Sequence, residues 1–157
     1  MKTTWLMSVA VLAGVFGLAT AGWGGSEEIP AQRGSATAEL TFGVSLTTDK
    51  AIYAAGESIV IELIVFNRSS KNLTFDFRDA QHYDFIIEDT EGNSVWRWAE
   101  GRRFVQVLGE ETLGPGREEV VYTGTYAGLL QPGDYKVIGI LVAQDKPLSA
   151  SVTITIG

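Results

Sequence analysis

Apolar and polar residues alternate over short stretches of the chain, and the clearest alternation spans residues 83–98. Residues 83–88 (YDFIIE) place an apolar side chain at every second position, the period of a strand with one buried face. Residues 89–93 (DTEGN) have the composition of a tight turn. The chain then returns with Trp96 and Trp98 on one face of a second strand. The pattern predicts a β-hairpin that supplies much of the core, because an aromatic side chain buries about 150–250 Å².

The same period predicts further strands, which are separated by Gly- and Pro-containing turns. Residues 58–67 are apolar on both faces, which is typical of a central strand. Short strands at intervals of about 8–12 residues predict an all-β fold, an immunoglobulin-like antiparallel β-sandwich of about eight strands. The other predicted strands are residues 40–46, with Leu40, Phe42, Val44 and Leu46 turned inward, and residues 73–77, 104–108, 120–126, 135–142 and 151–156.

The N-terminal region differs in composition from the rest of the chain. A basic start at Lys2 precedes an uncharged apolar run over residues 5–18, and Ala19-Thr20-Ala21 then gives the small-x-small pattern of a signal peptidase site. The run is shorter than the about 20 apolar residues of a membrane-spanning helix. The sequence therefore predicts a cleaved signal peptide over residues 1–21 and export to a bacterial periplasm or exterior, with no membrane association after cleavage. Residues 22–37 are predicted to be a flexible linker, which leaves residues 38–157 as the domain.

Charge and cysteine content narrow the classes of partner. The chain has 12 basic and 19 acidic residues, and loss of Lys2 with the leader changes the net charge from −7 to −8. This charge disfavours nucleic acid, which is bound through clusters of Lys and Arg, and suits a monomer. The chain has no Cys, so burial and sheet hydrogen bonds must hold the fold without disulfides.

Residue types that carry catalysis are scarce. The chain has one His, His82, at the start of a predicted strand, and no Cys. A catalytic triad needs several converging groups, so the sequence predicts that the protein is not an enzyme and uses no cofactor.

One spacing matches a calcium-binding loop. Asp89, Glu91, Asn93 and Glu100 fill positions one, three, five and twelve of the template. Position six, however, is Ser94 instead of Gly, and the residues after it form a predicted strand. An ordinary hairpin turn is therefore the preferred interpretation, and no metal is expected.

The aromatic residues of the hairpin region allow two interpretations. They either form an exposed platform for a sugar or peptide, or point into the core, and the core is favoured because large aromatic residues are usually buried. Arg97 lies on the opposite face and is predicted to be exposed or paired with a carboxylate such as Asp84. The aromatic residues concerned are Phe85, Trp96, Trp98 and Phe104.

A set of spaced residues extends beyond the hairpin to the C-terminal half of the chain. It consists of Tyr83, Asp84, Phe85, Gly92, Val95, Trp96, Trp98, Phe104, Gln106, Pro132, Gly133 and Tyr135, with Leu-Gly-Pro-Gly at residues 113–116. In this pattern the chain resembles the BsuPI family of bacterial intracellular proteinase inhibitors, over residues 38–157. The resemblance implies an all-β inhibitor domain that acts on a serine protease of the subtilisin class. The alternative function is a non-inhibitory secreted or envelope module that binds protein, peptide or sugar.

The best candidate for an inhibitory loop is residues 127–133 (AGLLQPG). Subtilisin-type proteases favour a large apolar residue at the bond they attack, and this loop carries Leu129 and Leu130 between flexible and rigid residues. The alternative is that one of these leucines closes the end of the sandwich. Arg102 and Arg103, with Arg97, are further candidate contacts, although a solvated turn is the preferred interpretation of the arginine pair.

Overall fold

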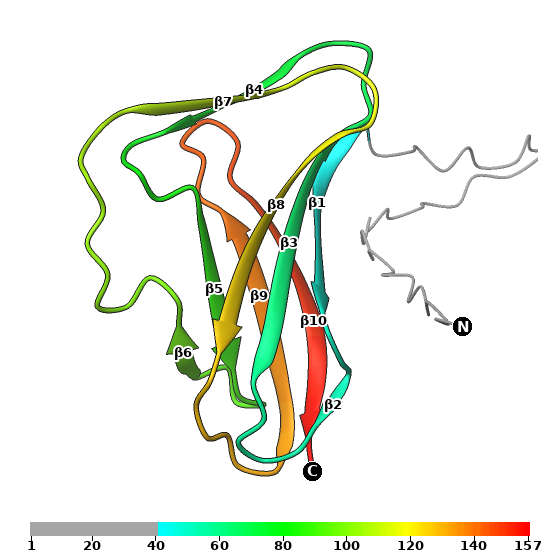
Figure 1. Ribbon diagram of the computed structural model, residues 1–157, viewed down its shortest axis with the longest axis vertical. Coiled ribbons are helices and arrows are strands. Elements are labelled where there is room, and N and C mark those ends of the chain that lie inside the picture. Colours follow the sequence, from blue (N-terminus) through cyan, green and yellow to red (C-terminus); the bar gives the residue numbers. More distant parts are fainter. Residues whose placement is uncertain (1–40) are drawn as a thin grey trace, which may run out of the picture. The chain divides into compact units, whose positions relative to one another are not determined.

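Ten β-strands and no helix make up residues 41–157, the part of the chain that the computed structural model describes (Figure 1). The all-β prediction is confirmed. The strands are β1 (Phe42–Thr48), β2 (Ile52–Tyr53), β3 (Ile59–Asn67), β4 (Leu73–Phe77), β5 (Tyr83–Glu88), β6 (Ser94–Arg97), β7 (Gly109–Leu113), β8 (Glu118–Tyr126), β9 (Gly133–Leu141) and β10 (Leu148–Ile156).

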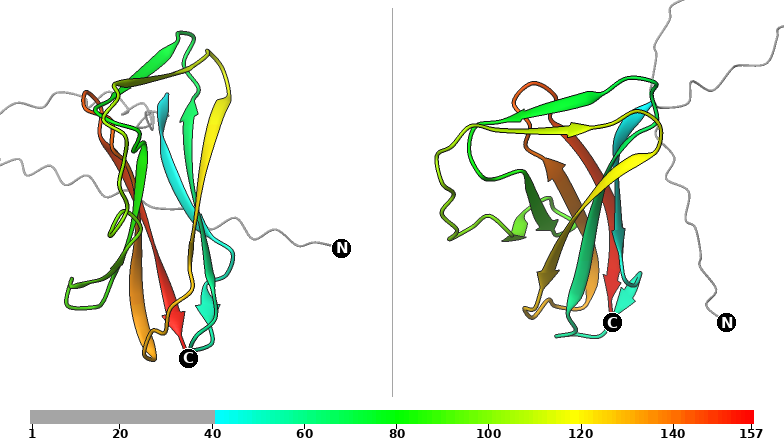
Figure 2. Two further views of the ribbon diagram at one scale, coloured as in Figure 1. Left: turned by 60° about the vertical axis from the view of Figure 1, so that its left-hand side comes forward. Right: turned by 45° about the horizontal axis from the view of Figure 1, so that its top comes forward.

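Two main sheets face each other in the arrangement of an immunoglobulin-like sandwich (Figure 2). One sheet has the strand order β1-β3-β8, and the other has the order β2-β10-β9-β5-β6. Neighbouring strands run antiparallel, except that β2 runs parallel to β10. The predicted sandwich is therefore confirmed, and β3 is central in its sheet as its two apolar faces indicated.

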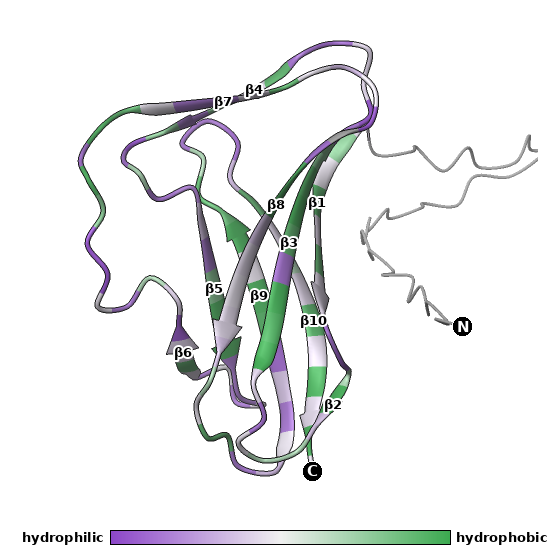
Figure 3. Ribbon diagram, viewed as in Figure 1, coloured by the Kyte–Doolittle hydropathy of each residue, from purple (hydrophilic) through white to green (hydrophobic). Residues whose placement is uncertain are grey.

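The main core lies between these sheets. The alternate residues of β3, Ile59, Ile61, Leu63 and Val65, are each 0% exposed. Figure 3 shows apolar residues along most of β3 and in alternating bands along β10, which is the pattern expected of a strand with one covered face. The side chains that meet those of β3 across the main core are apolar residues of the opposite sheet, among them Phe85, Ile87, Val137, Ile154 and Ile156.

Two glycines allow the Phe85 ring to lie between the sheets. A Cβ atom at Gly124, in β8 of the facing sheet, would lie 2.6 Å from Cδ2 of Phe85. A Cβ atom at Gly139, in the neighbouring β9, would lie 2.5 Å from Cδ1 of Leu46 and 3.5 Å from the Phe85 ring. The missing side chains at these two positions therefore set how closely the sheets approach each other around Phe85.

A third, two-stranded sheet of β4 and β7 runs across the upper end of the sandwich in Figure 1. It follows the β3–β8 pair after a bend that is held by Asn67, whose side chain is fully buried. The Nδ2 group of Asn67 donates to the carbonyl oxygens of Lys71, Leu113 and Gly114 at 2.8, 3.0 and 2.7 Å. Its Oδ1 atom accepts from the N–H and hydroxyl of Ser69 at 3.0 and 2.7 Å. The side chain of Asn67 thus holds both connections between the β1-β3-β8 sheet and the β4–β7 sheet: the one from β3 to β4 and the one from β7 to β8.

Two strand predictions differ from the structure. Residues 104–108 were expected as a strand but have no regular secondary structure, and the strand of this region is β7, which pairs with β4. The apolar content of residues 104–108 suggested a strand, yet none of the ladders in residues 41–157 includes them. Phe42, expected to point inward, is 36% exposed at the start of β1.

The predicted signal peptide, the predicted linker and Leu40 lie outside the described residues. Within residues 41–157, no helix is long and apolar enough to span a membrane.

Candidate functional site

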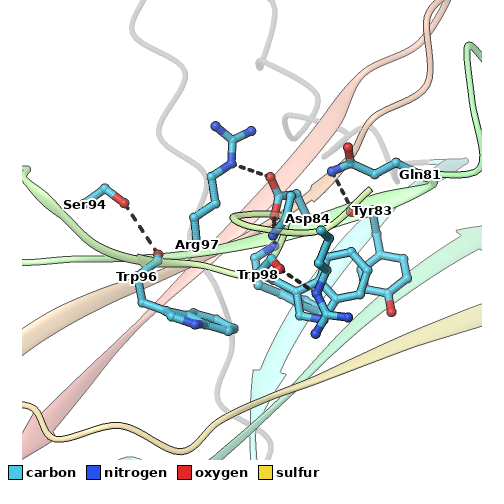
Figure 4. A network of polar contacts seen from close by, with 10 residues as sticks. Gln81, Tyr83, Asp84, Ser94, Trp96, Arg97 and Trp98 are labelled. Atoms are coloured by element: carbon cyan, nitrogen blue, oxygen red, sulfur yellow. Dashed lines mark hydrogen bonds and ion pairs between the residues drawn. The ribbon is translucent and has the colours of Figure 1, made fainter. Parts of the chain in front are cut away.

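The hairpin of β5 and β6 is organised by the buried carboxylate of Asp84, which is 0% exposed. Its Oδ2 atom accepts a hydrogen bond from Nε of Arg97 at 2.6 Å (Figure 4). Its Oδ1 atom accepts from the backbone N–H groups of Phe85 at 2.9 Å and Ala99 at 3.0 Å. The Arg97 side chain remains 53% exposed, so the predicted pairing with Asp84 is confirmed while most of the guanidinium faces solvent.

The two tryptophans of the hairpin lie at the margin of the core. Trp96 and Trp98 are each partly buried and pack against the main core cluster. The Trp98 ring lies 4.5 Å from the ring of Tyr83, which in turn stacks 4.7 Å from Tyr122 of the facing sheet. Trp96 packs on Tyr126, the last residue of β8, at 5.3 Å. Both tryptophans thus pack against the core, as was preferred over an exposed platform, although neither side chain is fully buried.

The turn after β6 leads into residues 104–108, which we call the apolar segment; Phe104 is half-buried and residues 105–108 are exposed. Arg102 precedes it, with its guanidinium 4.2 Å from the Trp98 ring and its Nε donating to the Trp98 carbonyl oxygen at 2.7 Å. Val105, Val107 and Leu108 of the segment are 70%, 59% and 83% exposed. The sequence reasoning missed this surface, because the same apolar residues were assigned to a strand.

The two adjacent leucines in the loop of residues 127–133 differ in their exposure to solvent. Leu129 is 69% exposed, whereas Leu130 is 6% exposed and belongs to the main core cluster. The hydroxyl of Tyr135 donates to the carbonyl oxygen of Gln131 at 3.0 Å, and Gly133 has a φ of 146°. Leu130 therefore closes the end of the sandwich, which was the alternative to an inhibitory loop, and Leu129 is exposed to solvent.

The remaining candidates have local roles. Gly92 has a φ of 85° in the hairpin turn, a conformation that glycine adopts without strain. Gln106 lies with its Nε2 atom 3.5 Å from Oδ2 of Asp79. Arg103 is exposed and follows Arg102 after β6.

The turn that matched the calcium template uses its acidic group for its own structure. Oδ1 of Asp89 accepts from the N–H groups of Glu91 and Asn93, each at 2.9 Å, and Oδ2 accepts from Nδ2 of Asn93 at 3.0 Å. The bonds from Asn93 lower the pKa of Asp89. Within the described residues, no three His, Cys, Asp or Glu side chains gather to form a possible metal site.

A partly buried polar cluster joins β7, β8 and the residue before β5. The Tyr122 hydroxyl donates to Oε2 of Glu111, and Nδ1 of His82 lies 3.3 Å from the same oxygen. Burial raises the pKa of Tyr122, and the hydrogen bond to Glu111 raises it further. His82 also stacks on Phe77 at 4.0 Å. The cluster links the β4–β7 pair to the main sandwich. The sequence did not indicate it, because His82, Glu111 and Tyr122 are far apart in the chain.

Comparison with known families adds an identification to this geometry. The model of the BsuPI family, described as intracellular proteinase inhibitor, matches residues 46–146. The chain belongs to the BsuPI family. The family suggested by the hairpin sequence is confirmed, over a shorter range than residues 38–157. The description of BsuPI names an inhibitory activity and a proteinase as the partner.

Solved structures and curated proteins add little to the BsuPI assignment. The chain is similar to the CARDB domain of PF1109 from Pyrococcus furiosus, with 15% identity, a TM-score of 0.43, and coverage of 74% of this chain and 87% of that one. It is also similar to Spo0M, a sporulation control protein from Bacillus subtilis, with 19% identity, a TM-score of 0.48, and coverage of 74% and 49%. No curated protein matches the chain by sequence.

The prediction of export is wrong, because BsuPI is described as an intracellular inhibitor. The prediction relied on the apolar run of residues 5–18 and on the small residues that follow it. An apolar run of this length also occurs in segments that are buried in a protein core or lie at a membrane surface, so its length alone does not establish secretion.

Proposed function

We propose that this BsuPI chain inhibits a serine protease of the subtilisin class by presenting Leu129 to the active-site cleft. The observation that carries the proposal is the contrast within the loop of residues 127–133. Leu129 is 69% exposed, while the adjacent Leu130 is 6% exposed and anchored in the core. A large apolar side chain is thus displayed on a loop whose next residue is fixed.

Rigidity of the loop supports the proposal, because a segment that is already ordered loses less conformational entropy on binding. Tyr135 holds the Gln131 carbonyl by a hydrogen bond of 3.0 Å. Pro132 fixes its own φ angle and restricts the backbone of the residue before it, Gln131. Trp96 packs on Tyr126 immediately before the loop, with ring centroids 5.3 Å apart. The exposed Arg97 lies next to Trp96 on the hairpin, and we place it as an outer contact with the protease.

The experiment is a titration of subtilisin activity with the wild-type protein and with a Leu129→Asp variant. Removal of an apolar anchor from the centre of an interface is expected to weaken inhibition by at least about tenfold. Val121→Asp is the matched control, because Val121 lies in β8 and is 50% exposed. Leu130 is unsuitable as a test position, since a charge at a buried site would unfold the protein.

The possible results separate the parts of the proposal. Equal inhibition by the wild type and Leu129→Asp would show that this loop is not the inhibitory one. A folded wild-type protein that inhibits no serine protease would remove the assignment of the target class. That result would favour the alternative of a non-inhibitory binding module.

A further inference from the structure

The turn between β2 and β3, residues 54–57 (AAGE), lies beside Leu129 at the lower end of Figure 1. A Cβ atom at Gly56 would lie 3.6 Å from Cδ1 of Leu129, the distance of an ordinary van der Waals contact. The turn and the loop that connects β8 to β9 are far apart in the sequence, yet they meet at the exposed leucine. A partner that covers Leu129 therefore also reaches this turn.

The turn is ordered by hydrogen bonds of its own. The Glu57 N–H donates to the Ala54 carbonyl oxygen at 3.0 Å, and Gly56 has a φ of 79°, as a type II turn requires at its third residue. Oε2 of Glu57 accepts from the Ala54 N–H at 3.0 Å, and Oε1 pairs with the ammonium group of Lys50. The turn is thus fixed before binding, so it loses little conformational entropy when a partner covers it.

The exposed residues of the turn are small. Ala54, Ala55 and Gly56 are all exposed, and none carries a side chain larger than a methyl group. A leucine can enter a pocket of another protein only where the surface around it does not hold that protein away, because tight interfaces are closely packed. The composition of the turn therefore suits a surface that the rim of a cleft must pass closely.

We propose that residues 54–57 are the second part of the surface that binds the protease, with Ala55 against the rim of the cleft that accepts Leu129. The inference rests on the proposed function and extends the same site. A stable interface buries roughly 800 Å² and about 20–30 residues on each partner, which is far more than one leucine supplies. The interface must therefore continue onto the neighbours of Leu129, and Gly56 places this turn among them.

The test is a titration of subtilisin activity with variants of the turn. Ala55→Arg and Ala55→Glu add long side chains of opposite charge at an exposed position. Both are expected to weaken inhibition by at least about tenfold, because either side chain would hold the rim of the cleft away. Ser70→Arg and Ser70→Glu are the matched controls and should inhibit like the wild type, since Ser70 is exposed in the loop at the other end of β3. Circular dichroism and urea denaturation check that all four variants are folded.

The outcomes distinguish this inference from the proposed function. Full inhibition by both Ala55 variants, with a loss in Leu129→Asp, would overturn the turn as a contact and leave the Leu129 loop in place. A loss in only one of the two Ala55 variants would show an effect of charge instead of contact and would also overturn the inference. Full inhibition by Leu129→Asp would overturn the role of Leu129, and with it the shared surface. A folded wild-type protein that inhibits no serine protease would overturn the proposed function itself.

Discussion

At the scale of single residues, Asp84 shows how a polar position in a strand pattern can be the most constrained position of a hairpin. The alternation of residues 83–88 placed it on the polar side, and its pairing with Arg97 could be predicted because Arg97 lies on the face opposite the tryptophans. Its complete burial and its bonds to the N–H groups of Phe85 and Ala99 could not. They depend on the turn after β6, whose path the strand pattern does not determine.

Substitution of Asp84 by Ala is expected to lower the free energy of unfolding by about 2–3 kcal/mol, because buried N–H donors lose their acceptor. Asp84→Asn keeps an acceptor oxygen and should fall between the wild type and Asp84→Ala. Arg97→Ala is the comparison variant: it keeps both N–H bonds to the carboxylate but removes the counter-ion of that buried charge, so it should cost less than Asp84→Ala and still be measurable. Urea denaturation of the four proteins measures the differences. Equal losses for Asp84→Ala and Arg97→Ala would show that the ion pair, and not the buried carboxylate, stabilises the hairpin.

At the scale of elements, the strands with strong alternation were predicted correctly, and those defined by pairing alone were not. Residues 58–67 and 73–77 correspond to β3 and β4. The strand β7, by contrast, contains two glutamates and a glycine and is a strand because it pairs with β4. The apolar segment is the opposite case, since its side chains suit a strand but no strand within residues 41–157 pairs with it. Hydrophobic period reports burial of a face, and it carries no information about which distant strand is available.

The approach of β8 to β5 gives a prediction at this scale. Gly124→Ala is expected to destabilise the protein by about 1–3 kcal/mol, because the added methyl group overpacks the core against Phe85. The added Cβ would lie 2.6 Å from the ring in the present structure, so the sheets must separate or the ring must move. Thr123→Ala, at the exposed neighbouring position of β8, is the control and should have a small effect. Chemical denaturation provides the comparison. An unchanged stability of Gly124→Ala would mean that the ring moves freely and that the glycine does not set the sheet spacing.

At the scale of the whole molecule, the sequence located the candidate site only in part. Leu129 and Leu130 were recognised together as a loop, but which leucine is exposed depends on how the loop crosses the end of the sandwich. The apolar segment was not recognised at all. Exposure is a property of the assembled sheets, so a search for displayed apolar residues needs the three-dimensional fold.

Two tyrosines in separate parts of the sandwich, the buried Tyr53 and the partly buried Tyr122, predict how the whole fold responds to alkaline pH. The Tyr53 hydroxyl donates to Oδ1 of Asp49 at 2.7 Å, and the Tyr122 hydroxyl donates to Glu111. Burial, followed by the bond to Asp49, raises the pKa of Tyr53 to about 12. Burial and the bond to Glu111 also raise the pKa of Tyr122. Each folded-state pKa therefore lies above the value of about 10 expected in the unfolded chain.

The sign of the effect follows from these directions. The unfolded chain loses its phenolic protons first, so the stabilisation from both groups is complete below about pH 10 and decreases as the pH rises further through the folded-state values. The urea midpoint is therefore expected to decrease steeply with pH above about 10. In a Tyr53→Phe, Tyr122→Phe double variant, the midpoint should be lower at neutral pH, because two hydrogen bonds are lost, but its decrease above about pH 10 should be shallower. Urea titrations at a series of pH values measure both quantities. The same slope in the double variant and the wild type would show that other groups, and not these two tyrosines, control the alkaline unfolding of the sandwich.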